Sequence, residues 1–318
     1  RNMIQYIKRS LTGAFLLSFL LMAVFRVFYC VITESSCLWY LHLSESFILL
    51  ATGVLLSFLN DRFGLLPERT QWIMVCYVWL VSCFPQTYEN PRMFAAALLT
   101  AASVYALVYA AFISGTKSGP FLCSFFITCA GILYTPVFFL LIPIIISFIR
   151  MVKLSGKDAV AFLGGILVPV FLVSSVLWFL HKDITEYWMQ TVIFFRGPDP
   201  SAAFASFTIT RIVLVSLLSL LVILSLFIRL VHRDTTTTVT ISRFYGSMFW
   251  IIFFTVLVMV LYPGYAKGLV SVVMVPASLL ITSLFSERRL FASRIWLALL
   301  LLAGVAHYIF VFFPIDII

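Results

Sequence analysis

One charged residue in this chain lies where a charge is costly to place. Arg26 interrupts a long apolar run, MAVFRVFYCVIT. Charged side chains within such runs commonly face the interior of a helix bundle or a water-filled cavity, and they mark functional sites. The long arginine side chain could also reach the lipid headgroups from one or two turns inside the run. The sequence leaves both interpretations of Arg26 open.

Other charged residues near the ends of apolar runs have the types that bind or transform an anionic substrate. Guanidinium groups bind phosphate and carboxylate through charge-assisted hydrogen bonds. The candidate anion-binding residues are Arg26, Arg92, Arg196 and Arg211. A carboxylate beside such a site could serve as a general base. The candidate catalytic residues are Glu34, Asp183 and Glu186.

The sequence contains no pattern that indicates a metal or a cofactor. The 4 histidines lie in separate segments, and none of them has metal-ligand spacing. The 6 cysteines include no CxxC pair, and the chain has no phosphate-binding or dinucleotide-binding glycine motif. We therefore expect no metal and no cofactor.

The composition identifies the class of protein that must position these residues. Of 318 residues, 63% are hydrophobic and 10% are charged, whereas soluble domains contain roughly 25% charged residues. The chain is therefore predicted to lie largely in lipid, as a single transmembrane domain over residues 1–318. A net charge of +9 would suggest a nucleic-acid partner in a soluble protein. Here we assign the excess to membrane-flanking loops, and expect lipids but no nucleic acid as partners.

The apolar runs predict an all-α, polytopic transmembrane helix bundle. A bilayer requires about 20 apolar residues per helix, and about eleven runs approach that length. They are 11–33, 44–60, 70–86, 93–113, 119–134, 136–152, 158–180, 209–231, 244–262, 268–286 and 293–313. Residues 119–152 would make one helix of about 50 Å, too long for one crossing. We therefore predict a tight hairpin there, with a re-entrant loop as the alternative.

The basic residues predict the orientation of the bundle. Fifteen lie in segments that would be cytoplasmic if the N-terminus is inside, and five lie in the opposite segments. This bias matches the positive-inside rule, so we predict an N-in, C-out topology. Residues 181–208 then form the main outer loop region, part of the mixed stretch HKDITEYWMQTVIFFRGPDPSAAFASFTITR.

One part of the chain resembles a known group of proteins. Across residues 81–180, FPQTYENPR, an alanine-rich run, LYTPVFFLLIPIIISFIR, KLSGKD and FLGGILVPVF follow one another. In this order they are similar to bacterial polytopic inner-membrane proteins without an established activity, which implies a multi-pass location in that membrane. A looser analogy is to membrane glycosyltransferases that use polyprenyl-phosphate sugars and place an acidic motif on a long first outer loop. Here that segment, ESSCLWYLHLSE, is short and has only Glu34 and Glu45.

Three classes of function fit these observations. In the first, the protein acts at the outer face on a lipid-linked glycan or phospholipid, and this is the class that we favour; whether it is an enzyme stays open. In the second, it is a noncatalytic subunit of an envelope assembly or secretion complex, with membrane-protein partners. In the third, it is a transporter or flippase. Against transport, ionisable residues are almost absent from the spans apart from Arg26.

Overall fold

The computed structural model describes residues 10–33, 39–66, 70–88, 90–113, 118–152, 155–194, 197, 209–231, 239–286 and 291–312. Within these residues the regular structure is entirely helical, with twelve α-helices and three short 3-10 helices. They are α2 (Leu11–Thr33), α3 (Trp39–Phe63), α4 (Trp72–Ser82), η1 (Pro85–Thr87), α5 (Pro91–Phe112), α6 (Ser118–Leu133), η2 (Thr135–Leu140), α7 (Leu141–Met151), α8 (Gly156–Phe179), α9 (Ile184–Phe194), α11 (Ile209–Val231), α12 (Val239–Leu261), η3 (Pro263–Tyr265), α13 (Ala266–Ser286) and α14 (Phe291–Phe312). The predicted all-α class is confirmed.

Each of the eleven apolar runs contains a helix, and within the described residues six of the helices are long and apolar enough to cross a membrane. These six are α2, α3, α5, α8, α12 and the η3–α13 segment, and the shorter apolar helices include α4, α6 and η2–α7. By helix length and hydropathy the protein is a multi-pass membrane protein. The number of spans and their orientation stay predictions.

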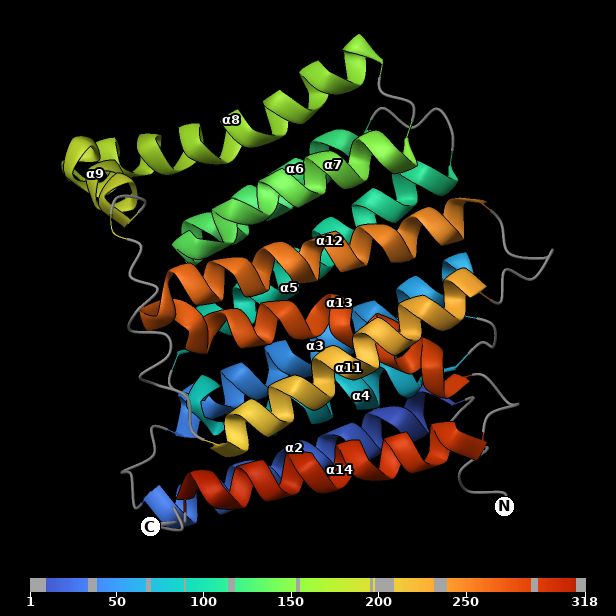
Figure 1. Ribbon diagram of the computed structural model, residues 1–318. Coiled ribbons are helices and arrows are strands. Elements are labelled where there is room, and N and C mark those ends of the chain that lie inside the picture. The colour runs from blue at the N-terminus through green and yellow to red at the C-terminus, as the bar shows by residue number, and fades with distance from the viewer. Residues whose placement is uncertain are drawn as a thin grey trace.

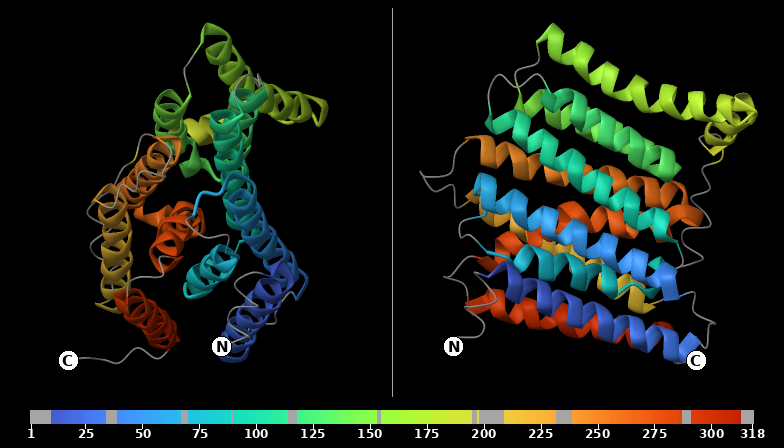
Figure 2. Two further views of the ribbon diagram at one scale, coloured as in Figure 1. Left: turned by 90° about the vertical axis from the view of Figure 1, so that its right-hand side faces the viewer. Right: turned by 180° about the vertical axis from the view of Figure 1, so that it is seen from behind.

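The helices run roughly alongside one another and alternate in direction (Figures 1 and 2). We call the end where α2 stops and α5 and α13 start the Arg26 end, and the opposite end, where α3 stops, the Arg62 end. Residues 118–152 leave the Arg62 end as α6 and return to it as η2 and α7. Residues 118–152 therefore form a pair of antiparallel helices, which both the predicted hairpin and the re-entrant alternative contain, so the choice between the two stays a prediction.

Two helices occupy the middle of the bundle. Viewed along the helices, α4 and α13 lie between two walls formed by the other helices (Figure 2, left). In the most apolar stretch of α13, 94% of the residues are buried, whereas in that of α8 only 17% are buried. Pro276 lies inside α13, where close neighbours can satisfy the backbone groups that a proline leaves free.

Small residues and hydroxyl groups join neighbouring helices. Ser103 Oγ donates to the Cys123 carbonyl oxygen at 2.8 Å, linking α5 to α6. Ser124 Oγ donates to the Phe162 carbonyl oxygen at 2.8 Å, linking α6 to α8. Gly165 lies at this second interface, where a Cβ atom would overlap Ser124 and the backbone of Phe121. Such close backbone approach is typical of helix packing in membranes.

The segment predicted to form the outer loop region, residues 181–208, contains a short helix that the sequence did not predict, α9, while its position outside the membrane stays a prediction. At His181 the backbone takes a φ of 54°, which ends α8 and turns the chain into α9. Trp188 Nε1 then donates to Ser174 Oγ at 3.0 Å and holds α9 against α8. The helix was missed because its 11 residues, ITEYWMQTVIF, are too few to span a membrane and include polar side chains.

Candidate functional site

Arg26 faces the interior of the bundle. Its side chain is only 8% exposed, so the guanidinium does not extend to the surface where lipid headgroups would lie. Of the two interpretations that the sequence leaves open, the structure therefore selects the interior position. The surroundings of this buried cation come from α2, α3, α5 and the segment that follows η1.

One nitrogen of Arg26 is held by two side chains of α3. Its Nη1 donates to Glu45 Oε2 at 2.5 Å and to His42 Nδ1 at 2.9 Å. Arginine can only donate, so His42 Nδ1 accepts, and the proton of the neutral imidazole lies on Nε2. The Glu45 side chain is 1% exposed. The ion pair therefore leaves this buried cluster close to electrically neutral.

Sequence reasoning missed Glu45 and His42 as partners of Arg26. We expected α3 to begin at residue 44, but it begins at Trp39. The earlier start places His42 and Glu45 three residues apart on one helix, and therefore on one face. The missed signal is that a buried arginine requires a nearby carboxylate, and Glu45 lies 19 residues further along the chain.

Aromatic rings cover the guanidinium. The Cζ atom of Arg26 lies 4.5 Å from the centre of the Tyr88 ring and 5.7 Å from that of Phe94, which gives favourable cation–π contacts. The Tyr88 hydroxyl donates to the Ser82 carbonyl oxygen at 2.7 Å. Burial raises the pKa of Tyr88 well above the ordinary value for tyrosine, so the phenol stays neutral beside the cation.

Within the described part of the chain, the remaining N–H groups of Arg26 meet no acceptor. Among the described residues, its buried Nε and Nη2 atoms have no hydrogen-bond partner. These two nitrogens donate from one edge of the planar guanidinium, the fork that matches the two oxygens of a carboxylate or phosphate. Leaving a buried donor unpaired costs roughly 1–3 kcal/mol. The Nε/Nη2 edge therefore holds two buried donors for which the described residues supply no acceptor.

Two further basic side chains, Arg92 and Lys267, lie at the starts of α5 and α13. Asn90 caps α5 by accepting from the Arg92 N–H at 3.0 Å, and Pro91 occupies the first helical position. Ser271 of α13 donates to the Met93 carbonyl oxygen at 3.2 Å, so the two helix starts are neighbours. Arg92 and Lys267 are both exposed there. Lys267 was not among the predicted site residues.

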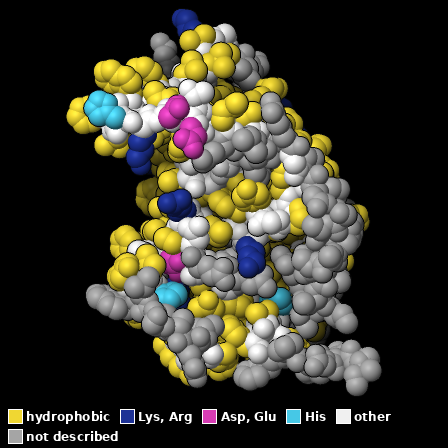
Figure 3. Space-filling model, turned by 90° about the vertical axis from the view of Figure 1, so that its left-hand side faces the viewer, with side chains coloured by type: hydrophobic (Ala, Val, Ile, Leu, Met, Phe, Trp, Pro, Cys, Tyr) yellow, Lys and Arg dark blue, Asp and Glu magenta, His cyan; other side chains and the backbone are white. Residues whose placement is uncertain are grey.

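The Arg26 end carries most of the described charged groups that we considered for function (Figure 3). Asp183 and Glu186 are exposed at the start of α9, and Asp183 Oδ1 caps that helix by accepting from the Thr185 N–H at 2.8 Å. In Figure 1, α9 and α2 lie at opposite edges of this end. The structure thus brings Arg26 together with Glu45 and His42, and does not bring it together with Asp183 or Glu186.

Three of the predicted site residues cannot be placed in this site. Glu34 and Arg196 lie outside the described residues. Arg211 belongs to the first turn of α11, but its side chain is likewise outside the described part of the chain. The arrangement around Arg26 therefore rests on α2, α3, α5 and Tyr88.

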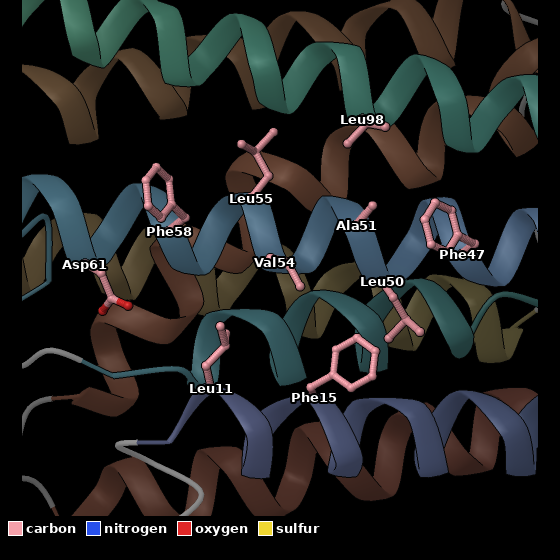
Figure 4. Close-up of a pocket in the computed structure, with 10 residues that line it drawn as sticks. All are labelled: Leu11, Phe15, Phe47, Leu50, Ala51, Val54, Leu55, Phe58, Asp61 and Leu98. Atoms are coloured by element: carbon pink, nitrogen blue, oxygen red, sulfur yellow. The ribbon is translucent and has the colours of Figure 1, made fainter.

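Two apolar grooves open on the sides of the bundle. The first lies between α2 and α3, has a volume of about 540 Å³ and is drawn in Figure 4. The second, of about 300 Å³, lies between α11, α12 and α13.

The chain matches no family model, no curated protein and no solved structure. Functional inference therefore rests on the geometry of these residues.

Proposed function

We propose that the protein binds the anionic headgroup of a membrane lipid or lipid-linked glycan at Arg26. The observation that carries this proposal is the unused Nε/Nη2 edge of a guanidinium whose side chain is 8% exposed. A water molecule could accept a hydrogen bond from one of these nitrogens, but an anion with two oxygens matches both donors. We infer a lipid-like ligand, because an anion that reaches this site from the bilayer must also have an apolar part.

The neighbourhood of Arg26 supports an anionic ligand over a cationic one. Glu45 is already paired with Nη1 of Arg26, so the carboxylate has little capacity left for a ligand cation. Arg92 and Lys267 are exposed at the same end of the bundle. Their charges would raise the local concentration of anionic headgroups and guide them toward the site.

The orientation proposed for this site is the outer face of a bacterial inner membrane. The uneven distribution of basic residues supports it, because fifteen of them fall in sequence segments that are predicted to be cytoplasmic and five in the segments predicted to lie outside. Binding of a headgroup at the outer face is compatible with an enzyme and with a membrane subunit of an envelope assembly. The geometry of the described residues favours binding without assigning a catalytic base.

The proposal is tested by lipid binding to the purified protein. Native mass spectrometry would compare retention of phosphatidylglycerol with that of zwitterionic phosphatidylcholine. Wild type should prefer the anionic lipid, and Arg26→Lys should weaken its retention about tenfold, because lysine keeps the charge but loses the bidentate fork.

Arg62→Lys is the matched control. Arg62 is at the opposite end, where its Nη1 donates to the Tyr105 hydroxyl at 2.7 Å on an exposed surface. This substitution should leave the lipid preference unchanged. Equal retention of the anionic lipid by wild type and Arg26→Lys would contradict the proposed function.

A further inference from the structure

His42 is a titratable side chain in direct contact with the proposed headgroup site. Its Nδ1 accepts from Arg26 Nη1 at 2.9 Å and lies 3.5 Å from Glu45 Oε2. The His42 side chain is 20% exposed, against 8% for Arg26 and 1% for Glu45. Histidine is also the side chain whose charge ordinarily changes between pH 5 and 8. Of the three groups, His42 is therefore the one best placed to exchange a proton with water.

The hydrogen bond from Arg26 requires a neutral imidazole. A guanidinium can only donate, and both ring nitrogens of a protonated imidazole are donors as well. Protonation of His42 would therefore break the contact between Nδ1 and Nη1 and place a second positive charge beside the first. In the absence of a ligand, the Arg26 cation thus favours the uncharged form of His42.

The other groups around His42 leave this charge balance unchanged. Among the described residues, the charged groups against it are Arg26 on α2 and Glu45 on α3. The Tyr29 ring of α2 packs edge-on against the imidazole at 6.1 Å, and Tyr88 lies against both Tyr29 and Arg26. Tyrosine side chains are ordinarily uncharged between pH 5 and 8. One positive and one negative charge therefore surround the imidazole, which can add a second positive charge.

An anionic ligand reverses the preference for an uncharged imidazole. Because Arg26 and Glu45 nearly cancel, an anion on the Nε/Nη2 edge leaves this buried site with a net negative charge. Protonation of His42 restores neutrality, and the new N–H can be donated to the Glu45 carboxylate oxygen that lies 3.5 Å from Nδ1. Arg26 Nη1 keeps Glu45 as its acceptor. The anion and the proton therefore each strengthen the binding of the other.

We propose that binding of the anionic headgroup at Arg26 is coupled to the uptake of one proton by His42. The inference rests on the proposed function, since it concerns the regulation of the same site. The site with protonated His42 binds the anion more tightly than the site with neutral His42. The affinity for the anion therefore rises as the pH falls through the range in which His42 gains its proton.

The test uses a ligand whose own charge does not change with pH. Phosphatidylglycerol is a phosphodiester and stays a monoanion between about pH 5.5 and about pH 8, the range in which histidine changes its charge. A short-chain phosphatidylglycerol would be titrated into the full-length protein in detergent by isothermal titration calorimetry. Wild type should bind it about tenfold more tightly at the lower pH. Titrations in two buffers of different ionisation enthalpy should also show net uptake of protons on binding.

His42→Asn and His181→Asn form a matched pair of variants. In His42→Asn an amide oxygen replaces Nδ1 as the acceptor for Arg26, but the amide takes up no proton. This variant should bind the lipid equally at both pH values, as weakly as wild type does at about pH 8. His181 is exposed at the same end of the bundle, and asparagine tolerates its φ of 54°. His181→Asn should therefore keep the pH dependence of wild type.

The outcomes separate this coupling from the proposed function. Equal affinity of wild type at both pH values with no net proton uptake would overturn the coupling, and so would a pH dependence that survives in His42→Asn. The measurement of proton uptake by wild type decides the matter even if a variant does not fold. Equal binding of phosphatidylglycerol and phosphatidylcholine at both pH values, or binding that Arg26→Lys leaves unaffected, would instead overturn the proposed function.

Discussion

The chemistry of the Arg26 end depends on which N–H groups of the Arg26 guanidinium bind protein side chains and which are left for a ligand. Nη1 is committed to Glu45 and His42, and this fixes the plane of the group against the Tyr88 ring. The Nε/Nη2 edge is thereby held in a defined orientation before any ligand binds. Such preorganisation lowers the cost of binding, because the side chain is not ordered at that moment.

A prediction at this scale separates the structural role of the ion pair from its binding role. Glu45→Gln leaves the Arg26 charge buried without its counter-charge, so it should destabilise the protein by about 3–5 kcal/mol. The double substitution Arg26→Leu with Glu45→Leu removes both charges and should recover most of that stability. It should not recover retention of anionic lipid, because no guanidinium remains.

Chemical denaturation of the detergent-solubilised protein, followed by tryptophan fluorescence, would measure these stabilities. Arg62→Leu serves as the control for loss of a surface arginine, and it should lower the free energy of unfolding by less than about 1 kcal/mol. A double variant that retained anionic lipid as well as wild type would show that the pair has a structural role only.

The sequence was sufficient to identify Arg26 but not its partners. A charge inside an apolar run is visible in a hydropathy pattern, and its cost indicates an interior partner. His42 precedes the predicted run 44–60 and Glu45 stands at its start, within the short polar segment ESSCLWYLHLSE, so neither was paired with Arg26. Their membership of α3 follows from contact with α2, and contacts between helices cannot be inferred from the pattern of one helix.

At the scale of helices, the close approach of α6 and α8 depends on one of two adjacent glycines. A Cβ atom on Gly165 would overlap Ser124 Oγ and the Phe121 carbonyl oxygen, whereas one on Gly164 would lie 3.8 Å from its nearest neighbour. Gly165→Ala should therefore destabilise the packing of α8 by about 1–3 kcal/mol. Gly164→Ala should be neutral or slightly stabilising, since alanine is the better helix former.

Limited proteolysis of the connection between α7 and α8, together with thermal unfolding, would report this difference. Cleavage should be faster in Gly165→Ala than in Gly164→Ala. Similar effects of the two substitutions would mean that α6 and α8 do not pack through Gly165.

The helices themselves were largely predictable, because apolar length is the dominant signal in a membrane protein. Each of the eleven runs contains a helix, although α3 begins five residues earlier than expected, at Trp39. The missed helix, α9, is short, and the Trp188–Ser174 hydrogen bond holds it on α8. Tertiary contact of this kind leaves no periodic signature in the sequence.

At the scale of the whole molecule, the proposed function requires the Arg26 end to face outward. Gly264, in the connection between α12 and α13, and Lys157, in the first turn of α8, are both exposed and lie at opposite ends. In a background free of native cysteines, Gly264→Cys should react with a membrane-impermeant maleimide in intact spheroplasts. Lys157→Cys should react only after permeabilisation, and the reverse pattern would exclude an outer headgroup site.

The most direct test of the account is the density on the Nε/Nη2 edge of Arg26. A cryo-electron microscopy map of the protein in nanodiscs that contain phosphatidylglycerol should resolve that edge, with an antibody fragment as a fiducial. We predict a phosphate within hydrogen-bond distance of both nitrogens, with Glu45 still on Nη1. Water alone on that edge, or a carboxylate of the protein itself, would contradict the central claim that Arg26 is a headgroup site.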